Sequence, residues 1–145
     1  IAHAAIDISY GLLQDLGHIL AASRVGAVLH EDRLPAAAAL AGLPADALRR
    51  AVLGGGDVYQ LCFTAPAARR DAVLAAARTA GARVTRVGGI VAHDPAQDAM
   101  QASAVTHTGG SSEIPGAARP RLVVLDATGQ PLAQLPAGFD HFPGA

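Results

Sequence analysis

Apolar residues recur along the chain with two spacings, one typical of helices and one typical of strands. Between Ser9 and Ala22 they fall on one face of a helix, at Leu12, Leu13, Leu16, Ile19 and Leu20. The same periodicity turns the side chains of Gln14, Asp15 and His18 toward solvent. The segment therefore predicts an amphipathic helix with a single buried face.

Two further segments predict helices: Asp46–Leu53, which precedes a glycine run, and Ala67–Ala80, which lies between a proline and a glycine. Apolar runs or alternation predict strands at Ala2–Ile6, Gly26–His30, Val58–Thr64, Val84–Val91 and Leu122–Leu125. A turn after the last of these predicts a hairpin with Leu132–Leu135. Strands that alternate with helices favour a layered α/β or α+β domain.

The segment His93–Arg119 has no apolar period and is rich in glycine, serine, alanine and proline. It predicts a flexible insertion loop within a single domain of residues 1–145, a length that can bury a core. The chain opens on Ile1-Ala2-His3, which is neither an initiator methionine nor a signal peptide. We interpret this opening as the sign of a longer protein.

Composition narrows the function classes. The net charge is −1 with scattered signs, which argues against a nucleic-acid-binding face. The chain has no lysine, so a phosphate-binding loop of the Gly-x-x-x-x-Gly-Lys type is impossible. No apolar run approaches the ~20 residues that span a bilayer, which predicts no membrane association. The single cysteine, Cys62, excludes an internal disulfide and fits a reducing, cytoplasmic compartment, where we expect it to be a buried, inert thiol.

Candidate chemistry lies at the start of the first predicted helix. Asp7 and Ser9 precede it, and a helix N-terminus favours phosphate through its free N–H groups and its dipole. A carboxylate is also the hard oxygen ligand that Mg²⁺ prefers. The alternative is that both residues only cap the helix. Similarly, Gly54–Gly56 could allow close approach of a ligand or could simply end a helix.

Three segments carry a family resemblance. The segment Ile6-Asp7-Ile8-Ser9-Tyr10-Gly11-Leu12 resembles the Asp-x-Ser-Asp-Gly-Leu motif of thiamine-monophosphate kinases, with Tyr10 in place of the second acid. Residues 53–64 resemble the family's Gly-Gly-Glu-Asp-Tyr-Glu-Leu segment, and residues 138–142 resemble its terminal Gly-Tyr-Asp-His-Phe. These kinases belong to the aminoimidazole-ribotide synthetase-like, ATP-dependent enzymes, which pair an N-terminal with a C-terminal α/β domain. This chain resembles the C-terminal one, which implies a mixed sheet covered by helices.

The resemblance implies a role for five residues. Asp7 would bind Mg²⁺, Ser9 would contact ATP, and Tyr10 stands at a second metal position. Asp57, in place of the family's glutamate, and Phe139 would contact the substrate. An aromatic face can hold a cationic thiazolium ring, although Phe139 could also anchor the tail to the core.

The implied reaction transfers the γ-phosphoryl group of ATP to thiamine monophosphate, with Mg²⁺ as cofactor. The implied partners are these two substrates, an N-terminal domain and a second subunit in a homodimer. Two alternatives remain open. The chain could be a binding or regulatory relative that has lost its chemistry, which Tyr10, Val58 and Gln60 favour because they replace acids of the family pattern. It could also be a folded structural fragment that binds nothing alone.

Overall fold

The computed structural model describes residues 1–56, 58–92 and 121–136. Three helices are described, and their bounds are α1 Leu12–Ser23, α2 Ala45–Gly54 and α3 Arg70–Thr79. The strands are β1 Ala4–Asp7, β2 Val25–His30, β3 Leu61–Thr64, β4 Gly88–Ala92 and β5 Leu122–Leu125. Short 3-10 turns occur at Glu31–Arg33, Ala38–Leu40 and Ala67–Arg69. Asp57, Phe139 and the predicted loop His93–Arg119 lie outside the described residues.

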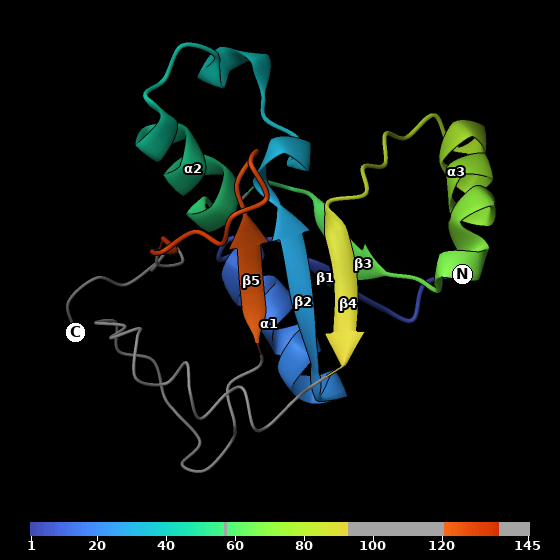
Figure 1. Cartoon of the computed structure of the whole chain (residues 1–145). Coiled ribbons are helices and arrows are strands. Elements are labelled where there is room, and N and C mark those ends of the chain that lie inside the picture. Colours follow the sequence, from blue (N-terminus) through green and yellow to red (C-terminus); the bar gives the residue numbers. More distant parts are fainter. Residues whose placement is uncertain (57, 93–120, 137–145) are drawn as a thin grey trace, which may run out of the picture.

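The strands form two small sheets (Figure 1). β1 and β3 pair antiparallel, with Asp7 opposite Leu61. The second sheet has the order β4-β2-β5, in which β2 runs antiparallel to β4 and parallel to β5. Parallel and antiparallel pairs therefore occur in one sheet, and the predicted mixed α/β class is confirmed.

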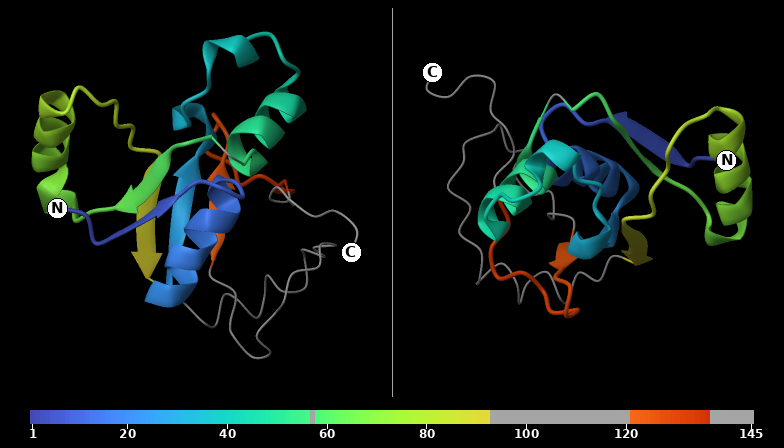
Figure 2. Two further views of the ribbon diagram at one scale, coloured as in Figure 1. Left: turned by 180° about the vertical axis from the view of Figure 1, so that it is seen from behind. Right: turned by 90° about the horizontal axis from the view of Figure 1, so that it is seen from above.

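Helix α1 lies between the two sheets and carries half of the buried apolar residues of the described part (Figure 2). Its apolar face is buried as its spacing predicts, and α1 contacts β1 and β3 on one side and β2 on the other. The buried apolar residues of the described part are Ile8, Leu12, Leu13, Leu16, Ile19, Leu20, Ala27, Leu29, Leu53 and Val124. The core is thus built almost entirely from aliphatic side chains.

Several predicted bounds and one predicted strand differ from the structure. Helix α1 begins at Leu12 rather than Ser9, because Gly11 has a φ of 110° that no helical residue adopts. Strand β3 begins only at Leu61, because Tyr59 has a φ of 53° and interrupts the extended backbone. The expected strand Leu132–Leu135 is replaced by one isolated bridge from Leu125 to Pro131. Two hydrogen bonds flank this bridge, from the amide of Asp126 to the carbonyl of Gln130 and from the amide of Leu132 to the carbonyl of Val124, both at 2.9 Å, so the absent N–H of Pro131 is not what ends the pairing.

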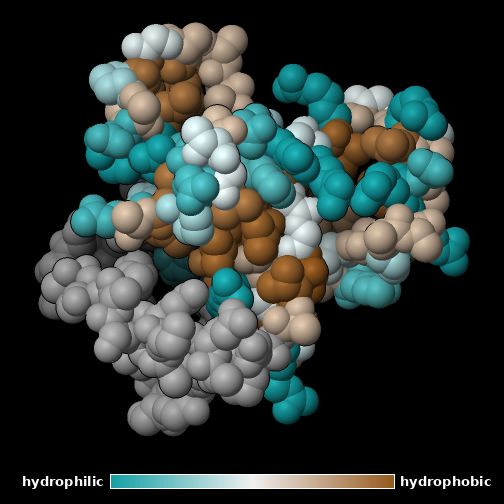
Figure 3. All heavy atoms as spheres, in the orientation of Figure 1, coloured by the Kyte–Doolittle hydropathy of each residue, from teal (hydrophilic) through white to brown (hydrophobic). Residues whose placement is uncertain are grey.

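Helix α3 stands apart from the core in Figure 1. None of its residues is buried, and Leu74 is 40% exposed. Apolar side chains also gather over the three-stranded sheet (Figure 3). Large apolar side chains more than one third exposed include Leu61, Phe63, Leu74 and Ile90. Across the described ranges, no helix is both long enough and apolar enough to cross a membrane.

Candidate functional site

A hollow of about 310 Å³ lies where β1 ends and β3 begins. Asp7, Ile8 and Ser9 line it from the segment between β1 and α1, and Tyr59, Gln60 and Leu61 line it from the other side. The amide of Ile8 donates to the carbonyl of Gln60 at 2.9 Å, which extends the β1–β3 pairing by one step. The antiparallel register therefore brings the two motif segments, far apart in sequence, to one place.

Asp7 and Ser9 present oxygen atoms on the same side of this hollow. Asp7 is exposed, Ser9 is half-buried, and the Ser9 hydroxyl donates a hydrogen bond to Oδ2 of Asp7. A hydroxyl that donates its proton to a carboxylate keeps its lone pairs available to a cation or a donor. The pair therefore offers a carboxylate and a hydroxyl oxygen, which are ligand types that Mg²⁺ accepts.

The expected solvent-facing position of Asp15 is wrong. Its side chain is 2% exposed, and Oδ2 accepts hydrogen bonds from the amides of Ser9 and Tyr10, both at 2.9 Å. A helical period cannot reveal this contact, because the partners precede the helix. The available signal was an acid in the first turn, which in a capping box reaches back to an amide before the helix. Both amides are occupied by Asp15, so the side chains of Asp7 and Ser9 remain as the loop's ligand groups.

Gly11 gives the loop its path into α1. Its φ of 110° lies in the region that favours glycine, and a Cβ there would stand 2.8 Å from the carbonyl carbon and oxygen of Gly54. Gly54 is the last residue of α2 and is itself buried. The glycines of the two motifs therefore meet in a backbone contact between α1 and α2. Gly54 thus ends a helix and packs against Gly11, which supports the structural interpretation of that glycine.

Tyr10 follows Ser9, is 43% exposed and is not among the described residues that line the hollow. Tyr59 stands at the rim and is 98% exposed. Within residues 1–56, 58–92 and 121–136, no group of three histidine, cysteine, aspartate or glutamate side chains converges to hold a metal ion. Asp7 and Ser9 are thus a partial donor set, which suits an ion that is also held by phosphate oxygens and water.

Cys62 lies on β3, half-buried and opposite Ile6 of β1. Burial raises the pKa of the Cys62 thiol, and the negative charge of Asp15 raises it further. The neutral thiol is therefore favoured at neutral pH, which supports its interpretation as an inert side chain.

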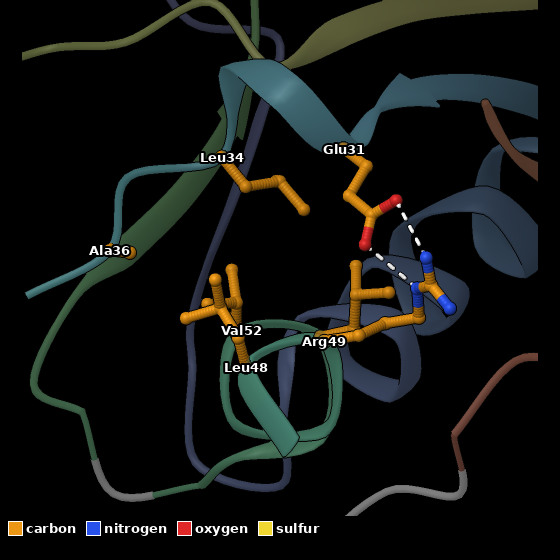
Figure 4. Close-up of a pocket in the computed structure, with 7 residues that line it drawn as sticks. Glu31, Leu34, Ala36, Leu48, Arg49 and Val52 are labelled. Carbon is orange, nitrogen blue, oxygen red and sulfur yellow. Dashed lines mark hydrogen bonds and ion pairs between the residues drawn. The ribbon is translucent and has the colours of Figure 1, made fainter. Parts of the chain in front are cut away.

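A second hollow, of about 60 Å³, lies between the 3-10 turn after β2 and helix α2 (Figure 4). Glu31 points toward Arg49, whose Nε and Nη2 donate to Oε1 and Oε2 at 2.7 and 3.1 Å. Apolar side chains of Leu34, Leu48 and Val52 form much of the remaining wall. This volume holds about two water molecules and is far too small for a nucleotide. The bidentate pair therefore has a structural role, which is to tie α2 to the end of β2.

Comparison with known proteins places this geometry in a family. Residues 1–97 match the family model described as AIR synthase related protein, C-terminal domain. The thiamine-monophosphate kinase of Salmonella typhimurium is 47% identical over 90 residues, which cover 61% of this chain and 27% of that protein. The thiamine-monophosphate kinase of Escherichia coli K12 is 44% identical over 94 residues, which cover 63% of this chain and 29% of that protein. The chain thus spans less than a third of these relatives.

Solved structures give the same picture of the fold. The thiamine-monophosphate kinase of Stenotrophomonas maltophilia K279a is 49% identical, with a TM-score of 0.60 over 63% of this chain and 29% of that one. The structure of AaThiL complexed with AMPPCP and TMP is 23% identical, with a TM-score of 0.57 over 97% of this chain and 34% of that one. At that identity the second likeness supports the fold alone.

Proposed function

Because the chain belongs to the family of AIR synthase related protein C-terminal domains, we propose that it is the C-terminal domain of a two-domain thiamine-monophosphate kinase. The proposed reaction moves the γ-phosphoryl group of ATP onto the phosphate of thiamine monophosphate. The observation that carries this proposal is the pair Asp7 and Ser9 at the hollow between β1 and β3, in the motif that resembles these kinases. The names of relatives 44–47% identical to this chain support it.

Asp7 and Ser9 would hold this domain's share of the ATP–Mg²⁺ site. The acceptor is already an anionic phosphate, so the enzyme must bring two negative groups together. A bound Mg²⁺ ion would neutralise phosphate charge at that point. Asp7 would supply a carboxylate oxygen to the ion, and the Ser9 hydroxyl, held by Asp7, would present its lone pairs beside it. The Mg²⁺ role and both residue assignments are part of the proposal.

The substrate side of the site would come from Asp57 and Phe139, which lie outside the described residues. We assign them to thiamine monophosphate on the motif resemblance. The remaining acids of the metal site would come from an N-terminal domain, and the whole enzyme would be a cytoplasmic homodimer. Exposed apolar side chains on β3 and α3, such as Phe63 and Leu74, support burial against further protein.

A second candidate is a relative of these kinases that binds ligands but has lost catalysis. Tyr10, Val58 and Gln60 favour it, since a neutral side chain stands where the motif has an acid. A phenol is a poorer hard ligand for Mg²⁺ than a carboxylate. The two candidates differ in turnover, which makes them separable by a rate measurement.

The test of the proposal is thiamine diphosphate formation from ATP, Mg²⁺ and thiamine monophosphate. We expect the two-domain protein to form the product and the isolated 145-residue chain to form none, because the remaining acids of the metal site are assigned to the N-terminal domain. A mock preparation is the control. Turnover by the isolated chain above that control contradicts the second expectation, and no turnover by the two-domain protein favours the impaired relative.

We expect Tyr10→Asp in the two-domain protein to lower the Mg²⁺ concentration that gives half-maximal rate, since it adds a carboxylate beside Asp7 and Ser9. A Mg²⁺ titration of the initial rate measures this. Leu43→Asp is the matched control, because Leu43 is 43% exposed like Tyr10, lines neither hollow and would gain the same charge. An unchanged titration for Tyr10→Asp, or an equal change in both variants, would remove Tyr10 from the metal site.

A further inference from the structure

Asp15 is the one buried charged side chain among the described residues, and neither the motif resemblance nor the proposed reaction gives it a role. It stands in the first turn of α1 and is 2% exposed. A carboxylate is retained at such a depth only when hydrogen bonds replace its lost hydration. Its partners therefore indicate what it does.

Those partners belong to the loop that carries the proposed ligands. Oδ2 of Asp15 accepts from the amides of Ser9 and Tyr10, each at 2.9 Å. The backbone amide of Asp15 donates to the carbonyl of Gly11 at 3.0 Å. One residue in the first turn of α1 thus contacts three consecutive residues that precede the helix, two of them through its side chain.

The consequence is a defined direction for the ligand side chains. With its amide turned inward to Asp15, Ser9 directs its hydroxyl to Oδ2 of Asp7, and both residues line the hollow. No side chain caps α1, because Gly11 occupies the cap position. Asp15 instead holds the two amides that precede the cap, and the Ser9 hydroxyl donates to Asp7 rather than capping the helix.

We propose that Asp15 is a positioning residue for the nucleotide–metal half of the site: its buried carboxylate holds the Ser9 and Tyr10 amides so that the oxygens of Asp7 and Ser9 face the bound nucleotide and its cation. This inference rests on the proposed kinase function. It predicts that loss of the Asp15 carboxylate weakens the use of ATP and Mg²⁺ more than that of thiamine monophosphate, because the thiamine half of the site is assigned to other segments.

The experiment compares the two-domain protein with its Asp15→Ala, Asp15→Asn and Asp71→Ala variants. We expect Asp15→Ala to raise the KM for ATP and the half-maximal Mg²⁺ concentration at least tenfold, with the KM for thiamine monophosphate changed less than threefold. Asp15→Asn should stay within threefold of wild type, because its one carbonyl oxygen has two lone pairs for the same two amides. Asp71→Ala is the control, since Asp71 is exposed in the first turn of α3.

Three results would overturn the inference: an Asp15→Ala protein with wild-type Mg²⁺ and ATP dependence, equal losses for both substrates, or an Asp15→Asn protein as impaired as Asp15→Ala. If Asp15→Ala does not fold, Asp15→Glu decides, because it keeps the charge but moves the oxygens by one methylene. A shift of the Mg²⁺ midpoint beyond threefold then supports the inference, and an unchanged midpoint overturns it.

An inactive wild-type protein would count against the kinase proposal instead. Amide hydrogen exchange in this chain then tests Asp15 separately. Exchange at Ser9 and Tyr10 should be at least tenfold faster in Asp15→Ala than in wild type, while equal rates would show that Asp15 does not hold the loop.

Discussion

We expect Gly11→Ala to lower the free energy of unfolding by roughly 2–6 kcal/mol. An L-residue at the Gly11 backbone angles, φ 110° and ψ 148°, costs about 1–3 kcal/mol in strain, because this region is essentially restricted to glycine. The added Cβ would also stand 2.8 Å from the carbonyl group of Gly54, which is backbone and cannot rotate away. Overpacking of this kind costs about 1–3 kcal/mol more. Urea unfolding of the 145-residue chain measures the sum.

Gly42→Ala separates the two contributions. Gly42 has a φ of 92°, but a Cβ there meets no atom within 4 Å. It should therefore lose only the ~1–3 kcal/mol of backbone strain. If Gly11→Ala and Gly42→Ala cost the same, the contact between α1 and α2 is not tight, and the glycines of the two motifs have no packing role.

The periodicity of the chain predicts α1 well because its burial is one-sided. The segments that form α2 and α3 were predicted instead from the glycine and proline residues that flank them. Strand ends are harder to predict, because they depend on partners rather than on the strand itself. β4 was expected from Val84 but begins at Gly88, opposite Leu29 near the end of β2. β5 likewise pairs with the following segment only through one isolated bridge, from Leu125 to Pro131, where a strand over Leu132–Leu135 was expected.

In the candidate site, too, residues within a sequence motif were predicted, whereas a contact that depends on a neighbouring segment was not. Motif resemblance located Asp7 and Ser9, and the structure brings both to one hollow. The burial of Asp15 was not predicted, because helical periodicity treats a charged side chain in the first turn as solvated. Only the path of the preceding loop shows that two amides point at this carboxylate. The roles of Asp57 and Phe139 remain predictions, since both lie outside the described residues.

The last prediction tests whether α1 is the central core element. Leu20 is fully buried on the helix that lies between the two sheets. Leu20→Ala should therefore cost about 2–5 kcal/mol, since large-to-small changes lose transfer free energy and leave a cavity that the surroundings close only in part. For a chain of this length each kcal/mol lowers the Tm by about 2–4 °C. Differential scanning calorimetry of the 145-residue chain measures the shift.

Leu74→Ala is the matched control on α3. Leu74 is 40% exposed on a helix with no buried residue, so the same truncation should cost well under half as much as at Leu20. Leu74→Ala removes few contacts in the isolated chain. If it lowers the free energy of unfolding more in the two-domain protein, α3 packs against the rest of the enzyme. Equal losses for Leu20→Ala and Leu74→Ala in the isolated chain would contradict the central place of α1, because α3 would then have to share its core.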